Sequence, residues 1–324
     1  MGCNKSLPVE NPKSFHTQRT ILERKLSLKK NLPRSFKTVS VGSINEFFKV
    51  LKALATTHSS TVLYAQDLKT GAFRAIREIK KQLINESQRF FKEFDILSVC
   101  DHPNIIKVYQ TIETPINYYT VFEYCDVGYL TSVVKKTGDE ITLSKIVREI
   151  IMALNHLHLQ GIAHCNLNPK ALLLSDSENP VLKLTGFDFA QVLECITEVD
   201  LKNLEYFYVS PEMLKKSFNE LTDLWSVGVV TYELLVGKLP FLSKDKRNIM
   251  KEIYNGEVDF SSVSFTVLSF NAQDFLMKLL KPDSTQRMTA KQALLHPWLS
   301  LSGKENILNN EAMMRLRNFK VTTK

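Results

Sequence analysis

Two loops hold the polar side chains that are best placed to do chemistry, because they stand at the two ends of a predicted hairpin. Apolar runs at 172–174 and 181–184 flank a segment rich in turn-forming residues, which is typical of two paired strands. The polar residues of the two loops are His164, Asn166, Asn168 and Asp188. The amide of Asn166 cannot accept a proton from a hydroxyl group, so this residue cannot act as a general base.

The chain before these loops is expected to form a small sheet with one helix. Strand-like runs at 61–67 and 73–79 flank a Lys-Thr-Gly turn, and two further strands are expected at 106–112 and 118–123. Between the two pairs, apolar residues at i, i+4 and i+7 predict an amphipathic helix over 86–99. This half of the chain is therefore expected to be rich in sheet.

The second half is expected to be helical. A regular apolar stripe over 143–157 predicts a helix in which Thr142 is the N-cap and Gly161 follows the end. The run 222–236 is apolar on most faces, which indicates a buried central helix, and two more helices are expected between 275 and 298. Together these elements predict an α+β fold.

The composition is that of an ordinary globular protein, with 324 residues of which 44% are hydrophobic and 23% charged. The sequence contains no apolar run of about 18 residues or more that could span a bilayer, and its N-terminus lacks the apolar core of a secretory signal. We therefore expect a cytoplasmic protein. The five cysteines are an odd number without a C-x-x-C pair, so neither a disulfide framework nor a zinc site is indicated.

The net charge of +8 is concentrated near the N-terminus. Residues 1–40 contain nine Lys or Arg and two Glu, whereas residues 41–324 contain 33 basic and 32 acidic side chains. A basic arm on a balanced body favours an anionic surface as the partner and argues against a nucleic-acid groove in the fold.

The first six residues match the pattern M-G-x-x-x-[ST] for N-myristoylation. Gly2 would carry the myristoyl group, and Cys3 beside it is a candidate for palmitoylation. One myristoyl chain binds a membrane only marginally, at roughly 10⁴ M⁻¹, but a second acyl chain or the basic arm would make the attachment stable. We expect a peripheral membrane location, and an unmodified basic tail is the alternative.

Several stretches in a fixed order resemble landmarks of the protein kinase family, and they cover about residues 45–300. The loop from His164 to Ala171 resembles the catalytic loop H-R-D-L-x-x-x-N, and residues 186–188 stand where the family has D-F-G. The other landmarks are Thr70-Gly71 with Ala75-Ile76-Arg77, His102-Pro103-Asn104-Ile105, Ser210-Pro211-Glu212, Asp223-Leu224-Trp225-Ser226-Val227-Gly228, and Arg287-Met288-Thr289-Ala290 with His296-Pro297-Trp298-Leu299. The last stretch and the segment 311–320 are similar to calcium/calmodulin-type and calcium-dependent serine/threonine kinases.

The resemblance implies a two-lobed protein-kinase-like fold, with a small sheet-rich N-lobe at 43–124 and a larger helical C-lobe at 125–300. We expect a basic arm with the acylation motif at 1–42 and a basic amphipathic tail at 301–324. No D-x-[DN]-x-[DN]-G loop follows the tail before Lys324, so calcium is not expected to bind in cis.

The resemblance also assigns nucleotide-binding positions, and some of them carry unusual residues. Arg77 stands at the position of the ATP-binding lysine, Glu93 at that of its glutamate partner, and Glu123 and Cys125 at the adenine pocket. The glycine-loop position, 55–60, contains no glycine, so side chains would crowd a backbone that must approach phosphates closely. ATP is therefore a candidate ligand without a firm assignment.

The catalytic positions implied by the resemblance have lost their chemistry. Asn166 replaces the general-base aspartate, and Asn168 replaces the catalytic-loop lysine. Ala171 and Gly186 stand at the two positions of the magnesium ligands, so Mg²⁺ is not expected to bind there. Asp188 is a candidate substitute ligand, because a slip of two residues in a strand keeps the same face.

Residues that resemble the structural contacts of the family are retained. Glu212 and Arg287 match a buried ion pair, and Asp223 matches the aspartate that holds the backbone of the catalytic loop. A half-broken buried pair costs about 3–5 kcal/mol, so a folded protein needs both members. Cys165, in contrast, replaces the arginine that would contact a phosphorylated activation segment.

These features favour a catalytically inactive pseudokinase that acts as a membrane-tethered scaffold or allosteric partner of an active protein kinase or a kinase substrate. Two alternatives stay open: a weakly active ATP-dependent serine/threonine kinase with a rearranged metal site, and a nucleotide-binding switch without phosphotransfer. The basic amphipathic pattern within 307–320 indicates a segment that docks on its own domain or on a calmodulin-like protein.

Overall fold

The computed structural model forms two compact units, each of which is considered by itself. It describes residues 39–57, 59–82, 84–132, 139–195, 204–217, 219–241, 243 and 245–300. Within these residues, unit 1 takes 39–101, 106–124 and 194–195, and unit 2 takes 102–105, 125–193 and 204–300. The acylation motif at Gly2 and Cys3 and the tail 301–324 lie outside the described residues, and the predicted domain boundaries stay predictions.

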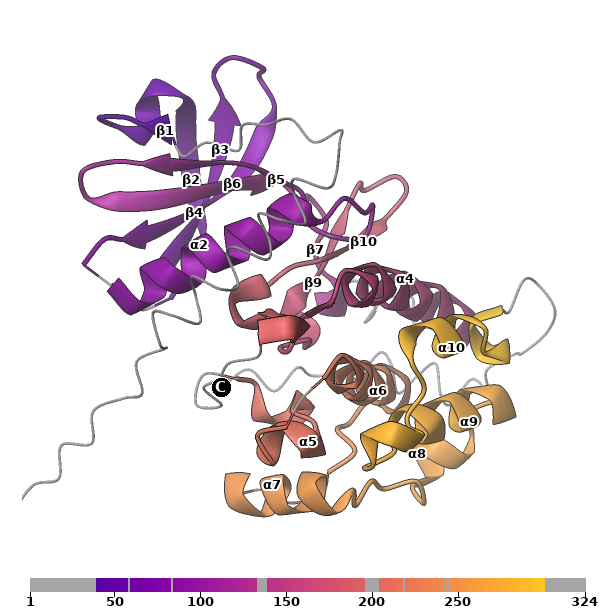
Figure 1. Ribbon diagram of the computed structural model, residues 1–324. Coiled ribbons are helices and arrows are strands. Elements are labelled where there is room, and N and C mark those ends of the chain that lie inside the picture. Colours follow the sequence, from indigo (N-terminus) through magenta and orange to yellow (C-terminus); the bar gives the residue numbers. More distant parts are fainter. Residues whose placement is uncertain are drawn as a thin grey trace, which may run out of the picture. The chain divides into compact units, whose positions relative to one another are not determined.

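Unit 1 is built on a six-stranded sheet in the order β1-β5-β6-β4-β3-β2 (Figure 1). The strands are β1 (Val39–Ser40), β2 (Phe48–Thr56), β3 (Ser60–Asp67), β4 (Phe73–Lys80), β5 (Val108–Glu113) and β6 (Asn117–Glu123). The short β1 runs parallel to β5, and all the other pairs are antiparallel. The four strands predicted from the sequence are confirmed, whereas β1 and β2 were not predicted.

The helix α2 (Ile84–Val99) lies along one face of this sheet (Figure 1). Its buried residues include Phe94 and Leu97, as the apolar spacing predicts. The sheet supplies Ile76, Ile112 and Val121 to its own apolar cluster. Because α2 and β4 belong to the same packed unit, side chains on the two elements can meet.

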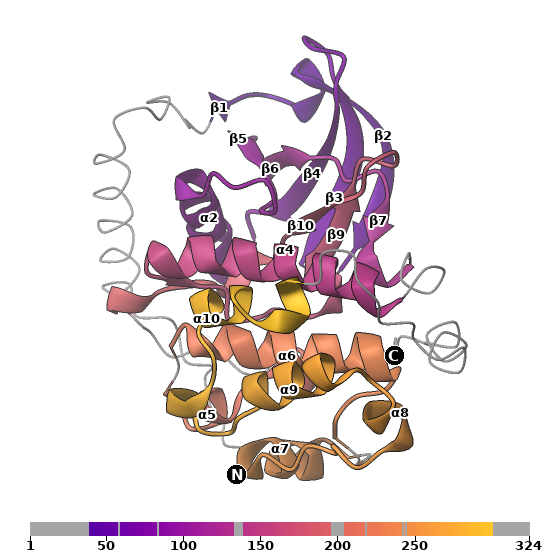
Figure 2. The ribbon, with the colours of Figure 1, turned by 90° about the vertical axis from the view of Figure 1, so that its right-hand side faces the viewer.

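Unit 2 is mainly helical. Its helices are α4 (Glu140–Leu159), α5 (Pro211–Leu214), α6 (Leu221–Val236), α7 (Lys246–Asn255), α8 (Val263–Thr266), α9 (Phe270–Leu279) and α10 (Ala290–Leu294). The central helix α6 packs against α4 and α9, and it lies between them in Figure 2. Its residues 222–236 are all buried, and Gly237 ends it with a φ of +78°. The predicted buried helix and the predicted α+β class are therefore confirmed.

The start of α4 differs from the prediction. Thr142 was expected to be the N-cap, but the helix begins one turn earlier, and Asp139 is the N-cap. The Asp139 carboxylate accepts hydrogen bonds from the backbone N–H of Thr142 (2.7 Å) and from its hydroxyl (2.8 Å). An aspartate satisfies the free N–H groups of the first turn as well as a threonine does, and its charge also suits the positive end of the helix dipole.

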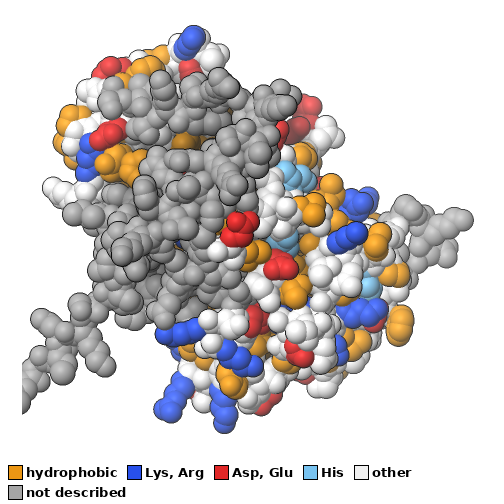
Figure 3. Space-filling view, in the orientation of Figure 1, with side chains coloured by type: hydrophobic (Ala, Val, Ile, Leu, Met, Phe, Trp, Pro, Cys, Tyr) orange, Lys and Arg blue, Asp and Glu red, His pale blue; other side chains and the backbone are white. Residues whose placement is uncertain are grey.

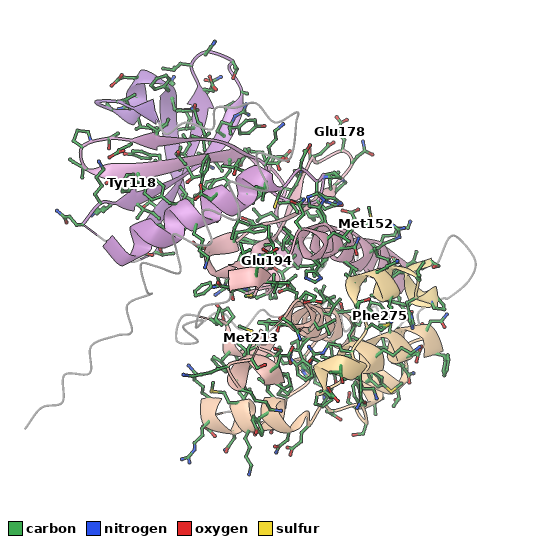
Figure 4. All side chains as sticks on the ribbon, viewed as in Figure 1. Tyr118, Met152, Glu178, Glu194, Met213 and Phe275 are labelled. Atoms are coloured by element: carbon green, nitrogen blue, oxygen red, sulfur yellow. The ribbon has the colours of Figure 1, made fainter. Side chains whose placement is uncertain are left out.

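The N-terminus of α4 also contacts two segments near the end of the described chain, at Ser269 and Trp298. The buried Glu140 carboxylate accepts hydrogen bonds from the indole N–H of Trp298 (3.0 Å) and from the Ser269 hydroxyl. Phe275, which is labelled in Figure 4, packs on the Trp298 ring with 4.8 Å between the ring centroids. The polar contacts satisfy groups that have no access to water, so the segment that follows α10 is held firmly to α4.

The hairpin predicted between the two polar loops is confirmed. β9 (Leu172–Ser175) pairs with β10 (Val181–Leu184) in antiparallel register, and β7 (Gly128–Tyr129) adds a short third strand. Beside it, β8 (Ile162–Ala163) pairs with β11 (Gln191–Val192). The short 3₁₀ segments are Ile44–Glu46, Pro169–Ala171, Phe187–Phe189, Leu193–Cys195, Tyr206–Tyr208, Ser284–Gln286 and Pro297–Ser300.

Candidate functional site

The loop before the hairpin is held by Asp223, a fully buried residue of α6. The Asp223 carboxylate accepts the backbone N–H of His164 (2.9 Å) and of Cys165 (2.8 Å). His158 donates a third hydrogen bond from Nε2 (2.9 Å). Burial by itself raises the pKa of Asp223, but the hydrogen bond and charge of His158 outweigh it and hold that pKa below its ordinary value.

The His164 side chain connects the two polar loops. Its Nε2–H donates to the carbonyl oxygen of Thr185 (2.9 Å), and Nδ1 accepts the backbone N–H of Asn166 (3.4 Å). These two contacts define the neutral tautomer. Complete burial lowers the pKa of His164, although the Asp223 carboxylate acts in the opposite direction. His164 is therefore a neutral structural residue, with its ring packed edge-on against Phe187.

The two asparagines of this loop hold each other. The Asn168 amide nitrogen donates to the backbone oxygen of Asn166 (2.8 Å), and its side-chain oxygen accepts the N–H of Lys170 (2.9 Å). Asn168 thereby caps the 3₁₀ turn Pro169–Ala171. The side chain of Asn166 is half-buried, and it has neither the charge nor the basicity to take a proton from a hydroxyl group.

The structure brings the two predicted magnesium-ligand positions together. A Cβ atom built on Gly186 would lie 3.6 Å from the Cβ atom of Ala171, which is ordinary van der Waals contact. The backbone N–H of Thr185 also donates to the Ala171 carbonyl oxygen (2.9 Å). Neither position has a side-chain oxygen, and Mg²⁺ binds almost only oxygen ligands. The residues at these two positions therefore do not fit a magnesium ion.

Asp188, the predicted substitute, lies in the 3₁₀ turn Phe187–Phe189 and is half-buried. Its charge raises the pKa of the fully buried His164, against the larger lowering effect of burial. Among the described residues, no group of three or more His, Cys, Asp or Glu is arranged to hold a metal ion. The role predicted for Asp188 stays a prediction.

Cys165 lies in an apolar environment. Its backbone has a φ of +63°, which is uncommon for a residue with a side chain, and its thiol is buried. The cluster around it comprises Ala163, Leu204, Val209 and Met213, with Phe189, Leu193 and Leu214 packed against them. Met213 is labelled in Figure 4. These apolar contacts join Cys165 to the described parts of the segment after the hairpin. At position 165, the resemblance to the kinase family implies an arginine.

Unit 1 retains one of the predicted ion pairs. Arg77 on β4 contacts Glu93 on α2, with 2.5 Å between Nη1 and Oε2. The Glu93 side chain is almost completely buried and the Arg77 side chain is largely so. A guanidinium can pair with a carboxylate as a lysine does, but its charge is spread over a planar group.

The turn at the glycine-loop position closes on itself. The Thr57 N–H donates to the Ser60 carbonyl oxygen (2.8 Å), and the Ser60 N–H donates to the Thr57 hydroxyl oxygen (3.0 Å). A phosphate cradle needs backbone N–H groups that point at the ligand. At least these two N–H groups are already engaged within the turn.

The two predicted adenine-pocket residues lie in different units. Glu123, at the end of β6 in unit 1, accepts the backbone N–H of Lys107 (2.7 Å). Cys125 belongs to unit 2 and is buried. Their roles stay predictions.

The predicted structural ion pair is present in full. Arg287, which is 3% exposed, pairs with both carboxylate oxygens of Glu212, at 2.6 and 3.0 Å. Its remaining N–H groups donate to the backbone carbonyl oxygens of Lys281 and Leu221. The Thr222 hydroxyl donates to Glu212 as well (3.1 Å). This buried pair is fully hydrogen-bonded, which is the condition under which a buried charge pair is tolerated.

Sequence reasoning missed two residues that support the polar loops. His158 donates to Asp223, and the half-buried Glu149 accepts hydrogen bonds from Asn104 (3.0 Å) and from the backbone N–H of Leu182 (2.9 Å). Both lie on α4, and the prediction of this helix used only its apolar positions. No sequence signal separates them from ordinary polar residues of a helix.

The described part of the chain has no helix whose length and apolar composition would let it cross a membrane.

Comparison with known families gives one extensive match. The profile of the protein kinase domain family matches residues 48–299. This range includes every predicted site residue apart from Gly2 and Cys3.

Curated relatives include kinases from three organisms. Calcium-dependent protein kinase 5 of Plasmodium falciparum (isolate 3D7) is 32% identical over 257 residues, which are 78% of this chain and 45% of that protein. A probable myosin light chain kinase of Dictyostelium discoideum is 34% identical over 251 residues, 76% of this chain and 80% of that protein. Calcium-dependent protein kinase 21 of Arabidopsis thaliana is 28% identical over 328 residues, 98% of this chain and 59% of that protein. The chain thus spans about half the length of the calcium-dependent kinases it matches.

Proposed function

Because the chain belongs to the protein kinase family, with calcium-dependent protein kinases among its relatives, we propose that it is a pseudokinase, a kinase domain that binds partners without transferring phosphate. The observation that carries this proposal is the pairing of Ala171 with Gly186. The two positions lie side by side, as a metal site requires, but they offer a methyl group and a hydrogen atom. Without Mg²⁺, the transferred phosphoryl group loses several kcal/mol of charge stabilisation.

The loss of a base points the same way. The amide of Asn166 stands where a carboxylate would accept the hydroxyl proton, and general-base catalysis is typically worth about 10² to 10⁴ in rate. The turn at the glycine-loop position adds a third defect, because the backbone N–H groups of Thr57 and Ser60 are already engaged in hydrogen bonds within it. The effects of such defects do not add, but each one lowers the rate of transfer.

A nucleotide-binding switch is the second candidate, and the Arg77–Glu93 pair favours it. This pair places a cation on β4 next to a buried glutamate, at 2.5 Å. A cation so placed can attract the phosphates of a nucleotide even where no metal binds. A weakly active kinase would in addition need Asp188 to act as a metal ligand.

Membrane attachment and partners complete the proposal. We propose that acylation at Gly2 and Cys3, together with the basic arm, holds the protein at the cytoplasmic face of an anionic membrane. There it would act as a scaffold or allosteric partner of an active kinase or of a kinase substrate. The names of its relatives point to calcium, and a calmodulin-like protein that binds the segment 301–324 is the partner that would bring calcium regulation to this chain.

The test is the thermal unfolding midpoint of the full chain with and without millimolar ATP, each with and without Mg²⁺. A bound ligand at 100 times its dissociation constant stabilises by about 2.7 kcal/mol, which is readily detected. We expect no shift that depends on Mg²⁺. A shift with ATP alone would select the nucleotide switch, and a shift that requires Mg²⁺ would overturn the pseudokinase proposal.

A matched variant shows that the assay can detect a working site. Asn166→Asp, Ala171→Asn and Gly186→Asp together restore the base and both metal ligands at positions that already lie close together. We expect this variant to acquire Mg²⁺-dependent stabilisation by ATP. Asp188→Asn in the wild-type chain is the control for the weak-kinase alternative, since it would abolish any transfer that uses Asp188.

A further inference from the structure

Unit 2 has a strongly basic face that plays no part in the proposed function. This basic face consists of five exposed cations, which are Lys215 and Lys216 after α5 and Lys246, Arg247 and Lys251 on α7. Figure 3 shows Lys and Arg side chains gathered at the lower end of the molecule, over the α5 and α7 labels of Figure 1. Two tyrosines, Tyr206 and Tyr254, contribute aromatic rings to it.

The helix α7 presents two of its cations, Arg247 and Lys251, on the side away from the core. Arg247, Lys251 and Tyr254 are spaced i, i+4 and i+7, so they share one side of the helix. Ile249 and Ile253 are its buried residues. The side that carries the cations is therefore open to a partner.

Cation–π contacts join the separate segments into one surface. The Lys215 ammonium lies 4.7 Å from the centroid of the Tyr254 ring, which links the end of α5 to α7. The Lys246 ammonium lies 5.1 Å from the centroid of Tyr206, just before α5. Tyr254 is 51% exposed even with this contact.

Described carboxylates do not pair with four of the five cations of the basic face. Asp245 caps α7 by accepting the N–H of Arg247 (2.9 Å), and Glu252 accepts hydrogen bonds from Ser243. Lys215, Lys246, Arg247 and Lys251 form no ion pair with any carboxylate that the structure describes. Their charges are thus available to an anionic partner.

We propose that the basic face is a second contact with an anionic lipid leaflet, additional to the N-terminal arm. Lys and Arg near such a leaflet are attracted by its negative surface potential, and exposed tyrosines are favoured at the headgroup level. An extended chain of 38 residues spans up to about 125 Å, so an acylated N-terminus has a long reach from the first described residue. Two linked contacts reinforce each other, because the first raises the effective concentration of the second.

A lipid leaflet fits better than an acidic protein because the chain has two separate basic regions. Residues 1–40 carry nine basic and two acidic side chains, and they require the same kind of partner as the basic face. A continuous anionic surface satisfies both regions at any spacing. An acidic protein would need two acidic patches at a matched distance.

The experiment measures vesicle binding of the full chain carrying Gly2→Ala, which prevents N-myristoylation and so tests the basic face apart from the proposed anchor. The vesicles contain phosphatidylcholine with or without phosphatidylserine. The face variant is Lys246→Glu, Arg247→Glu and Lys251→Glu, and the matched control is Lys49→Glu, Lys69→Glu and Lys80→Glu, three exposed cations of unit 1. The two glutamates at 246 and 247 lie in the first turn of α7, where they suit the helix dipole, and all three substituted side chains are exposed, so the face variant is expected to fold.

We expect the face variant to bind phosphatidylserine vesicles at least about tenfold more weakly than the parent, and the control to change by about twofold or less. Equal binding of the two triple variants would overturn the proposal, since only net charge would then matter. Unchanged vesicle binding with weakened binding to polyglutamate would overturn it in favour of an acidic protein. If the Gly2→Ala parent binds vesicles more weakly than the acylated protein, and the face variant binds no more weakly than this parent, the acyl anchor is supported and the basic face is rejected.

Discussion

Two regions of unit 2 differ in how far their residues match the predicted ones, although both contact the helix α6. Around the β9–β10 hairpin, the positions expected to carry a base and two metal ligands hold Asn166, Ala171 and Gly186. In the second region, Glu212 of α5 and Arg287 form an ion pair with two hydrogen bonds. The first region has an amide, a methyl group and a hydrogen atom at the positions where reactive groups were predicted, whereas the second has both members of the predicted ion pair.

The difference separates the residues that hold the fold from those that do the chemistry. A half-exposed asparagine in place of an aspartate leaves the backbone of the loop unchanged, because Asp223 holds that backbone from below. The loss of Arg287 would instead leave a buried carboxylate without its counter-ion. The second region is therefore needed for folding itself, whereas the side chains at 166, 171 and 186 can differ without breaking a contact that holds the fold.

Arg287→Ala gives the largest effect that we expect. It strands the Glu212 carboxylate in the interior, and breaking such a pair destabilises by about 3–5 kcal/mol. Urea unfolding at neutral pH measures the loss. Lys170→Ala breaks the exposed Lys170–Glu205 pair and is the control, with an expected change within about 1 kcal/mol. Similar losses in the two variants would remove the distinction between the regions.

Asp223→Ala should come next, with a loss of about 2–3 kcal/mol, because the buried N–H groups of His164 and Cys165 lose their acceptor. Asp223→Asn keeps one side-chain oxygen and should cost less. Hydrogen exchange at residues 164 and 165 is the direct measurement. If exchange there stays as slow as in the wild type, the loop is held by something other than Asp223.

His164 should make stability depend on pH. Its pKa is lowered in the folded protein, so between that pKa and the ordinary value of about 6.5 the unfolded chain binds more protons. Its contribution is therefore fully present above about pH 6.5 and is lost as the pH falls, by at most about 1.4 kcal/mol per pH unit. Asp223, Asp188 and His158 are the charged groups that act on it.

The measurement for His164 is urea unfolding between about pH 5 and 7, in the wild type and in His164→Gln. The variant should lose stability less steeply as the pH falls. Parallel curves for the two proteins would show that another group sets the pH dependence.

Gly186→Ala should give the smallest effect, a loss of about 1 kcal/mol. The position has a φ of +80°, where a side chain is strained, but the added Cβ meets Ala171 at an ordinary distance of 3.6 Å. Gly186→Asp should cost less than Gly186→Ala, since aspartate tolerates this conformation better. Thermal unfolding distinguishes the two variants, and a much larger loss for Gly186→Asp would mean that a restored ligand does not fit.

Local pattern was enough to predict most elements. Apolar runs and turn residues located β9 and β10, and the apolar stripe of α4 located its helix. The strand β2 was missed because all but one of its residues are exposed, so it lacks the alternation that marks a half-buried strand. The helix α7 did have a signal, with an aspartate before it and isoleucines four residues apart at 249 and 253. The N-cap of α4 was placed three residues too late, which is a usual error at helix ends.

The sequence by itself determined which reactive groups this protein lacks, because a missing carboxylate needs no geometry to be recognised. The closeness of Ala171 and Gly186 follows from the predicted hairpin, in which Leu172 pairs with Leu184. Tertiary structure alone decided that His158 supports Asp223 and that Cys165 is packed among apolar side chains. Each of these contacts joins residues far apart in the chain. Local spacing carries no information about such pairs, since they form only when separate elements pack together.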